Sequence, residues 1–182
     1  MQKRLVLDQA QLSITISRFC HQLIENHDDF ANTVLLGLQP RGSLVVDRII
    51  SRMLEIQNVN LQFGYLDATF HRDDFRRRDL PLRVNETKID FLIENKKVVL
   101  VDDVLYKGRS VRAAMDAMIA FGRPQKVELM VLIDRKFTRD FPIKPDYHGR
   151  QVNTLESEYV MVEWRNQGFP ADAIWITEKE SK

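Results

Sequence analysis

The sequence has 182 residues, a length typical of one globular domain, so we expect a single domain over residues 1–182. Its 27 basic and 26 acidic side chains leave a formal charge of +1, which excludes a strong overall field toward nucleic acid or membranes; any basic patch must be local. Cys20 is the single cysteine, which excludes an internal disulfide, and no run reaches the roughly 18–20 apolar residues of a membrane span, so we expect a cytoplasmic protein.

The first half of the chain predicts two helices and two strands. Apolar residues recur at helical spacing over 11–25, and a short buried strand follows at 34–38. We expect a second helix over about 43–54, and a strand over 61–70 where apolar and polar residues alternate. Residues 75–90 are rich in charge and predict a hairpin or a mobile loop.

The second half predicts a β-α-β unit. It consists of a strand from Val98, a helix over 111–121 and a strand over 127–133. Gly122 and Pro124 follow the helix in the order that commonly ends one. Because strands and helices alternate along the chain, the sequence predicts an α/β fold with a mostly parallel sheet covered on both faces.

Residues 98–110 carry the most informative pattern. An apolar run of strand type ends in Asp102 and Asp103, and a short turn with Gly108 and Ser110 precedes the expected helix. The start of a helix favours a phosphate, and ligands of parallel sheets bind at the carboxyl ends of the strands. The alternative is a generic crossover whose acids only cap the helix. Acids, glycine and hydroxyl together favour a phosphorylated sugar.

This pattern resembles the phosphoribosyl-diphosphate (PRPP) signature of the type I phosphoribosyltransferases. The wider chain, from about 7 to 162, resembles one branch, the pyrimidine operon attenuator/uracil phosphoribosyltransferase (PyrR) family, whereas residues 165–182 match poorly. The supporting segments are LGLQPRG at 36–42, LDATFHRDD at 66–74, GRP at 122–124, LIDR at 132–135 and FPIKPDYHGR at 141–150. The resemblance implies a parallel sheet flanked by helices, with a small hood formed by the N-terminal segment and roughly 135–182.

The resemblance also implies the roles of individual residues. Asp102 and Asp103 are expected to meet the ribose hydroxyls and, together with PRPP, to hold Mg²⁺; with Arg41 they form the expected catalytic set. The remaining expected sites are the 5′-phosphate cradle of Tyr106, Lys107, Gly108, Arg109 and Ser110; the pyrophosphate loop of Gln39, Pro40, Arg41 and Gly42; the flexible loop of Arg72, Asp73 and Asp74; and the base pocket of Asp134, Arg135, Val160 and Met161.

The implied chemistry explains why such residues are needed. Breaking the anomeric C–O bond of PRPP builds positive charge on the ribose and negative charge on the departing pyrophosphate. Carboxylates near the ring, and Mg²⁺ with Arg41 at the pyrophosphate, stabilise opposite ends of that separation. No protein nucleophile is required because the base nitrogen attacks, so positioning and exclusion of water carry the rest.

Three positions distinguish this chain within the implied family. Tyr106 stands where the purine-salvage branch has an acid resembling a general base; a phenol is a poor base at neutral pH, which favours a pyrimidine unless the ring only packs. Lys107 replaces a usual threonine and either adds a cation to the cradle or points into solvent. Pro40 also replaces a threonine, and we expect the Gln39–Pro40 bond to be cis, or to become so with ligand.

Members of this branch also bind a leader RNA, and the matching positions here are Ser17, Arg18 and His21, with Lys144 and Arg150. Such cations suit phosphate contacts, although the alternative is solvated surface and the near-neutral total charge gives no independent support. We therefore expect a uracil phosphoribosyltransferase, assembled as a homodimer or a higher assembly of dimers. Two alternatives stay open: a nucleotide-sensing RNA-binding regulator with vestigial catalysis, and a purine (hypoxanthine/guanine) phosphoribosyltransferase.

Overall fold

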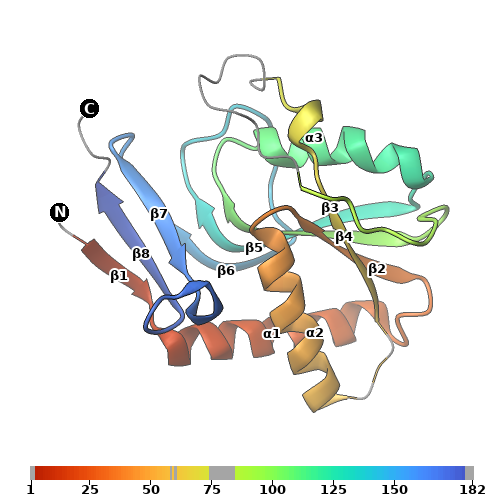
Figure 1. Cartoon of the computed structure of the whole chain (residues 1–182), viewed down its shortest axis with the longest axis horizontal. Coiled ribbons are helices and arrows are strands. Elements are labelled where there is room, and N and C mark those ends of the chain that lie inside the picture. Colours follow the sequence, from red (N-terminus) through yellow and green to blue (C-terminus); the bar gives the residue numbers. More distant parts are fainter. Residues whose placement is uncertain (1–2, 58, 60, 74–84, 179–182) are drawn as a thin grey trace.

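A computed structural model describes residues 3–57, 59, 61–73 and 85–178. Its centre is a five-stranded sheet in the order β3-β2-β4-β5-β6, in which every pair of neighbours is parallel. The strands are β2 (Thr33–Leu38), β3 (Gln62–Leu66), β4 (Lys97–Leu105), β5 (Lys126–Arg135) and β6 (Tyr147–Val152). The expected α/β class with a parallel sheet is confirmed (Figure 1).

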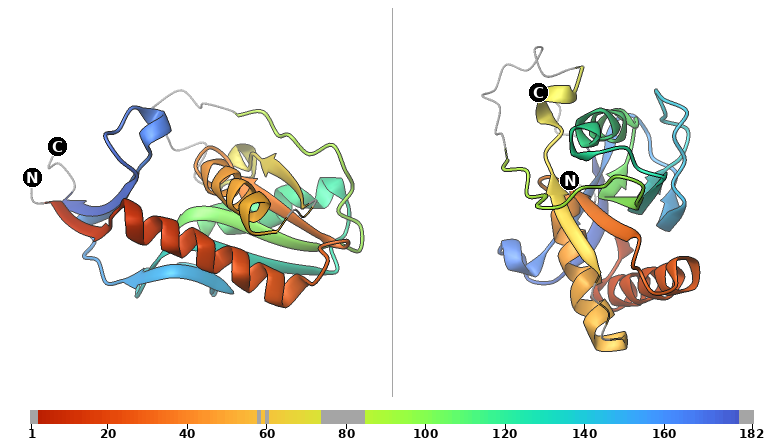
Figure 2. Two further views of the ribbon diagram at one scale, coloured as in Figure 1. Left: turned by 90° about the horizontal axis from the view of Figure 1, so that it is seen from below. Right: turned by 90° about the vertical axis from the view of Figure 1, so that its right-hand side faces the viewer.

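Helices cover both faces of this sheet (Figure 2). The helices α1 (Gln9–His27) and α2 (Gly42–Ile56) pack on one face, and α3 (Arg109–Met118), continued by the 3₁₀ helix η3 (Ile119–Phe121), packs on the other. Successive residues of β4 alternate between the two cores: Val99 joins the α1/α2 side and Val98 the α3 side. A strand buried on both faces explains the continuous apolar run before the two acids.

Both ends of the described chain meet in a second, smaller sheet. The strand β1 (Lys3–Leu7) pairs antiparallel with β8 (Ala173–Glu178), which in turn pairs antiparallel with β7 (Glu158–Glu163). Figure 1 shows this three-stranded sheet beside one end of the main sheet. The expected hood from the chain ends is therefore present. Its expected boundary near 135 is wrong, because β6 hydrogen-bonds to β5 and belongs to the main sheet.

The sequence-based boundaries differ from the structure in a few places. Strand β3 ends at Leu66 rather than 70, because the Asp67 carboxylate accepts from the Thr69 backbone N–H (2.8 Å) and a 3₁₀ helix, η1 (Thr69–His71), follows. Helix α1 begins earlier than predicted, since Asp8 and Gln11 form a reciprocal capping box. In the segment 75–90, which is expected to form a hairpin or a mobile loop, Lys88 forms an isolated antiparallel β-bridge with Tyr65. Residues 74–84, Asp74 among them, lie outside the described residues.

Within the described part of the chain, no helix combines the length and apolar character needed to cross a bilayer.

Candidate active site

The two acids lie at the carboxyl end of β4, where the expected pyrophosphate loop approaches them. Asp103 is buried and accepts a short hydrogen bond from Arg41 Nε, while Asp102 is partly exposed and accepts from the Asp103 backbone N–H at 2.9 Å. A Cβ on Gly42 would lie 2.1 Å from the Val101 carbonyl oxygen, so only glycine lets the loop pack this closely on β4. The Gln39–Pro40 peptide bond is cis, as expected.

Electrostatics favour a cation beside this acid pair. Although part of Asp102 is exposed, the loss of water around its carboxyl raises its pKa well above its usual range, and the neighbouring Asp103 carboxylate raises it further. A divalent cation would reverse both effects by stabilising the ionised form. Among the described residues no group of three or more histidine, cysteine or acidic side chains is gathered to hold a metal. The pair therefore fits Mg²⁺ whose other oxygen ligands come from phosphate groups and water.

The expected phosphate cradle forms the turn before α3. Gly108 has φ +87°, a left-handed conformation that favours glycine, and α3 begins at the next residue. Ser110 Oγ accepts from Arg72 Nη1 at 2.7 Å, which brings the expected flexible loop to the cradle. The first N–H groups of α3 lack intrahelical acceptors, which makes this turn suited to an anion.

Carboxylates already neutralise the cations of the cradle. Arg109 lies 2.5 Å from Asp73 and 2.8 Å from Asp140, and the Lys107 ammonium lies 3.6 Å from Asp140. Lys107 is half exposed, so it is neither buried in the cradle nor directed wholly into solvent. An anionic ligand at this turn would have to compete with these two carboxylates.

The expected base-pocket residues come from two elements. Asp134 and Arg135 end β5; the Arg135 guanidinium lies 3.9 Å from the centre of the Tyr106 ring, and Asp134 accepts from Gln151 at 3.0 Å. Val160 and Met161 lie on β7, and the next residue of that strand accepts a 2.5 Å hydrogen bond from Arg41 Nη2. Tyr106 is thus stacked on Arg135, and the assignment of these residues to a base pocket stays a prediction.

The expected RNA positions lie along α1 and the segment around β6. Arg18 donates to the carbonyls of His148 (3.2 Å) and Gly149 (2.7 Å), and Arg150 donates to the Val6 carbonyl (2.5 Å). His21 and Lys144 are exposed. The two arginines therefore serve the fold, by tying α1 and β1 to β6, whatever else they bind.

The sequence patterns do not single out Arg139 and Asp140, which contact the cradle. Both follow β5 in the chain, so they reach the same sheet edge as the acids of β4. The signal that could identify them is the topology, because residues that follow neighbouring parallel strands lie at the same edge of the sheet.

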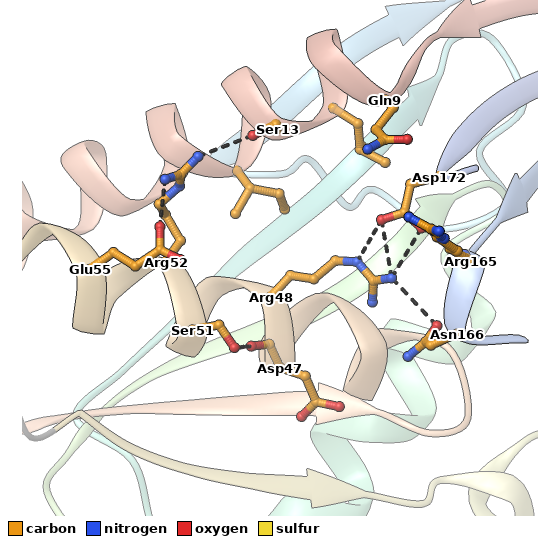
Figure 3. Close-up of a pocket in the computed structure, with 12 residues that line it drawn as sticks. Gln9, Ser13, Asp47, Arg48, Ser51, Arg52, Glu55, Arg165, Asn166 and Asp172 are labelled. Atoms are coloured by element: carbon orange, nitrogen blue, oxygen red, sulfur yellow. Dashed lines mark hydrogen bonds and ion pairs between the residues drawn. The ribbon is translucent and has the colours of Figure 1, made fainter. Parts of the chain in front are cut away.

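A separate cavity of about 730 Å³ lies between α1, α2 and the loop that contains the 3₁₀ helix η4 (Arg165–Gln167) (Figure 3). The acid pair does not line it. Arg48 reaches across it to Asp172 (3.2 Å) and Asn166 (3.4 Å) and stacks 3.7 Å above the Trp164 ring. Arg52 similarly pairs with Glu55 at 2.6 Å. Because its walls come from α1, α2 and the loop between β7 and β8, the cavity lies at the junction between the main sheet and the hood.

Comparisons with known proteins agree with this geometry. The family model described as "Phosphoribosyl transferase domain" matches residues 5–172. Proteins named "Bifunctional protein PyrR" are similar over most of the chain: that of Listeria monocytogenes is 40% identical over 184 residues (99% of this chain and 100% of the relative), and that of Caldicellulosiruptor bescii is 43% identical over 157 residues (86% of each). Another, from Geobacter sp., is 38% identical over 169 residues (93% and 95%).

Solved structures show the same fold at low sequence identity. A hypoxanthine phosphoribosyltransferase from Staphylococcus aureus matches with a TM-score of 0.71 at 16% identity, covering 97% of this chain and 93% of that one. A hypoxanthine phosphoribosyltransferase of Trypanosoma cruzi matches with a TM-score of 0.72 at 12% identity, covering 97% of each chain. At such identities the match concerns the fold and says nothing of the base.

Proposed function

The chain belongs to the PyrR branch of the type I phosphoribosyltransferases and is a pentosyltransferase, and from this premise we propose that it transfers the phosphoribosyl group of PRPP to uracil. The products are uridine monophosphate and pyrophosphate. The observation that carries the proposal is one continuous segment: Asp102 and Asp103 at the end of β4, then a left-handed glycine, then the start of α3.

In this proposal the acids and Arg41 act on opposite ends of the breaking bond. The ribose lies at the acid pair, with its 5′-phosphate at the start of α3 and its pyrophosphate toward Arg41. The buried Asp103 carboxylate stabilises positive charge on the ribose, and the Arg41 guanidinium stabilises negative charge on the leaving group. Arg41 is joined to Asp103 and to the Val162 carbonyl, so its guanidinium is oriented before substrate binds.

Mg²⁺ is the ion that this acid pair would hold with the substrate's own oxygens. When bound, it would neutralise charge on the pyrophosphate. Asp102 would supply an oxygen from its partly exposed position. A cation there would oppose the two causes that raise the pKa of that carboxyl and would keep it ionised.

Uracil is the proposed acceptor because no acid occupies position 106. The Tyr106 ring is stacked against Arg135 and offers no carboxylate to a purine ring. A purine acceptor is the alternative, and the fold alone does not separate the two. The solved hypoxanthine phosphoribosyltransferases share this fold at 12–16% identity, so their substrate does not identify the base used by this chain.

The test offers PRPP and Mg²⁺ with uracil, hypoxanthine or guanine separately, and follows pyrophosphate release. We expect turnover with uracil alone. In Asp103→Asn we expect turnover to fall by at least about a hundredfold, because a charge-stabilising group is lost, with the folded state retained. Formation of a purine nucleotide would show that the protein is a purine phosphoribosyltransferase instead. Unchanged turnover in Asp103→Asn would mean that the acids are misassigned.

A second function is supported by the word "Bifunctional" in the relatives' names. We propose that the surface around Arg18, His21, Lys144 and Arg150 binds a pyrimidine-operon leader RNA. The test compares titrations with leader and scrambled RNA, with His21→Ala and Lys144→Ala as variants that remove no hydrogen bond described above. Equal affinity for both RNAs would remove this function. PRPP binding without turnover on any base would instead favour a nucleotide sensor.

A further inference from the structure

The outer side of the phosphate turn is covered by residues 139–143. The backbone N–H groups of Asp140 and Phe141 donate to the Lys107 carbonyl at 3.1 and 3.3 Å. A Cβ on Gly108 would lie 3.2 Å from Ile143 Cδ1, so the turn and this segment are in close contact. The carbonyl side of the turn is therefore occupied by protein.

Arg139 holds the two preceding carbonyls of the same turn. Its Nη1 lies 3.1 Å from the Leu105 carbonyl oxygen and closer still to that of Tyr106. Its Nε donates to Ile143 (3.1 Å), and its Nη2 forms a short ion pair with the buried Asp134 carboxylate. The Arg139 side chain is 21% exposed, so these contacts are shielded from solvent.

Peptide geometry means that these contacts also fix the direction of the backbone N–H groups of the phosphate turn. In a trans peptide the carbonyl of one residue and the N–H of the next point in opposite directions. Because the carbonyls of Leu105, Tyr106 and Lys107 all face the 139–143 segment, the N–H groups of Tyr106, Lys107 and Gly108 face away from it. Successive N–H groups that point one way form an anion-binding concavity.

We propose that Arg139 is a positioning residue for substrate: it aims the backbone N–H groups of the phosphate turn at the 5′-phosphate and fixes that turn to Asp134 on the base side. This inference rests on the proposed function. Arginine suits the role because its planar fork reaches a carboxylate and several carbonyls at once, whereas a lysine ammonium is a single point. Asp134 gains a partner that a buried carboxylate requires.

The experiment measures binding of ribose 5-phosphate and of inorganic pyrophosphate by calorimetry, which does not depend on turnover. In Arg139→Lys we expect ribose 5-phosphate to bind about tenfold more weakly, equivalent to about 1.4 kcal/mol, and pyrophosphate to change by less than about twofold. The KM for PRPP should rise in parallel. Arg52→Lys is the matched control, since Arg52 also joins a carboxylate and a side-chain oxygen but contacts no active-site turn.

A double variant separates positioning from folding. Asp134→Asn with Arg139→Gln removes both charges of the pair and leaves no buried ion unpaired. We expect it to recover thermal stability lost in Arg139→Gln alone without recovering ribose 5-phosphate affinity. Recovery of both, or ribose 5-phosphate affinity within twofold of wild type in folded Arg139→Lys, would overturn the inference. A wild-type protein that binds ribose 5-phosphate but transfers nothing would contradict the proposed function and leave this inference standing.

Discussion

Arg109, the first residue of α3, holds Asp73 on one side and Asp140 on the other. Together with the bond from Arg72 to Ser110, this places the last described residues before position 74 directly on the phosphate turn. Arg72 and Asp73, which are expected to close over substrate, thus contact the cradle. Asp73 competes there with any phosphate for the same guanidinium.

Removing that competition should strengthen phosphate binding. We expect Asp73→Asn to tighten ribose 5-phosphate binding by about two- to fivefold, the range of an exposed ion pair, with the gain shrinking at high salt. Calorimetry at two salt concentrations measures this. The control is Asp116→Asn, which removes an exposed carboxylate paired with Arg112 on the same helix. Weaker binding in Asp73→Asn would mean that Asp73 itself helps to hold the ligand.

The raised pKa of Asp102 makes the protein's stability depend on pH. A carboxyl whose folded pKa is raised keeps its proton longer in the folded state than in the unfolded chain. Its contribution is therefore complete below the unfolded pKa and is lost as pH rises toward the folded value. We expect Asp102→Asn to be more stable than wild type at pH 8, with the difference vanishing near pH 3; urea unfolding across this range tests it.

At the scale of elements, α2 links the acid site to the hood. Arg41 precedes its first turn and bonds to β7. Arg48, two turns later, bonds to Asp172 (Figure 3) and stacks on Trp164. Arg41 thus holds β7 itself, and Arg48 holds the segment that joins β7 to β8. Helix α2 therefore sets the position of β7, which carries the proposed base-side residues.

Removal of the Arg48 contacts with Asp172 and Trp164 should destabilise the attachment of the hood to α2. We expect Arg48→Ala to lower the free energy of unfolding by about 1–3 kcal/mol, because a half-buried ion pair and a cation–π contact are lost together. Denaturant unfolding measures this. Arg52→Ala, from the same cavity but paired only at the exposed surface, should cost less than about 1 kcal/mol. Equal losses in both variants would contradict the link.

Elements with a strong local pattern could be predicted from the sequence, and others could not. The apolar runs of β2, β4 and β5 are buried on both faces, so their composition alone predicts them. Strand β6 is an edge strand in which only Tyr147 and Val152 are buried, so its composition gives no such signal. Because of that weak pattern, the expected hood boundary near 135 precedes the observed end of the main sheet at Val152.

For the whole molecule, the same distinction separates the two halves of the candidate site. The acids, glycine and hydroxyl of the phosphate turn all lie within the single segment 102–110, so spacing along the chain predicts them. Arg139 and Asp140 come some thirty residues later and meet the turn only because β5 lies beside β4. Contacts made through sheet topology are invisible to local patterns, and for that reason the outer wall of the cradle could not be predicted.

The pairing of β1 with β8 sets an order of events during synthesis. Among the described strands β1 is made before all the others and its partner β8 after them, so the hood cannot close until residues 173–178 have left the ribosome. The parallel sheet, by contrast, has all its strands once β6 emerges. A nascent chain therefore acquires its phosphate turn before it acquires β7, the strand to which Arg41 is anchored.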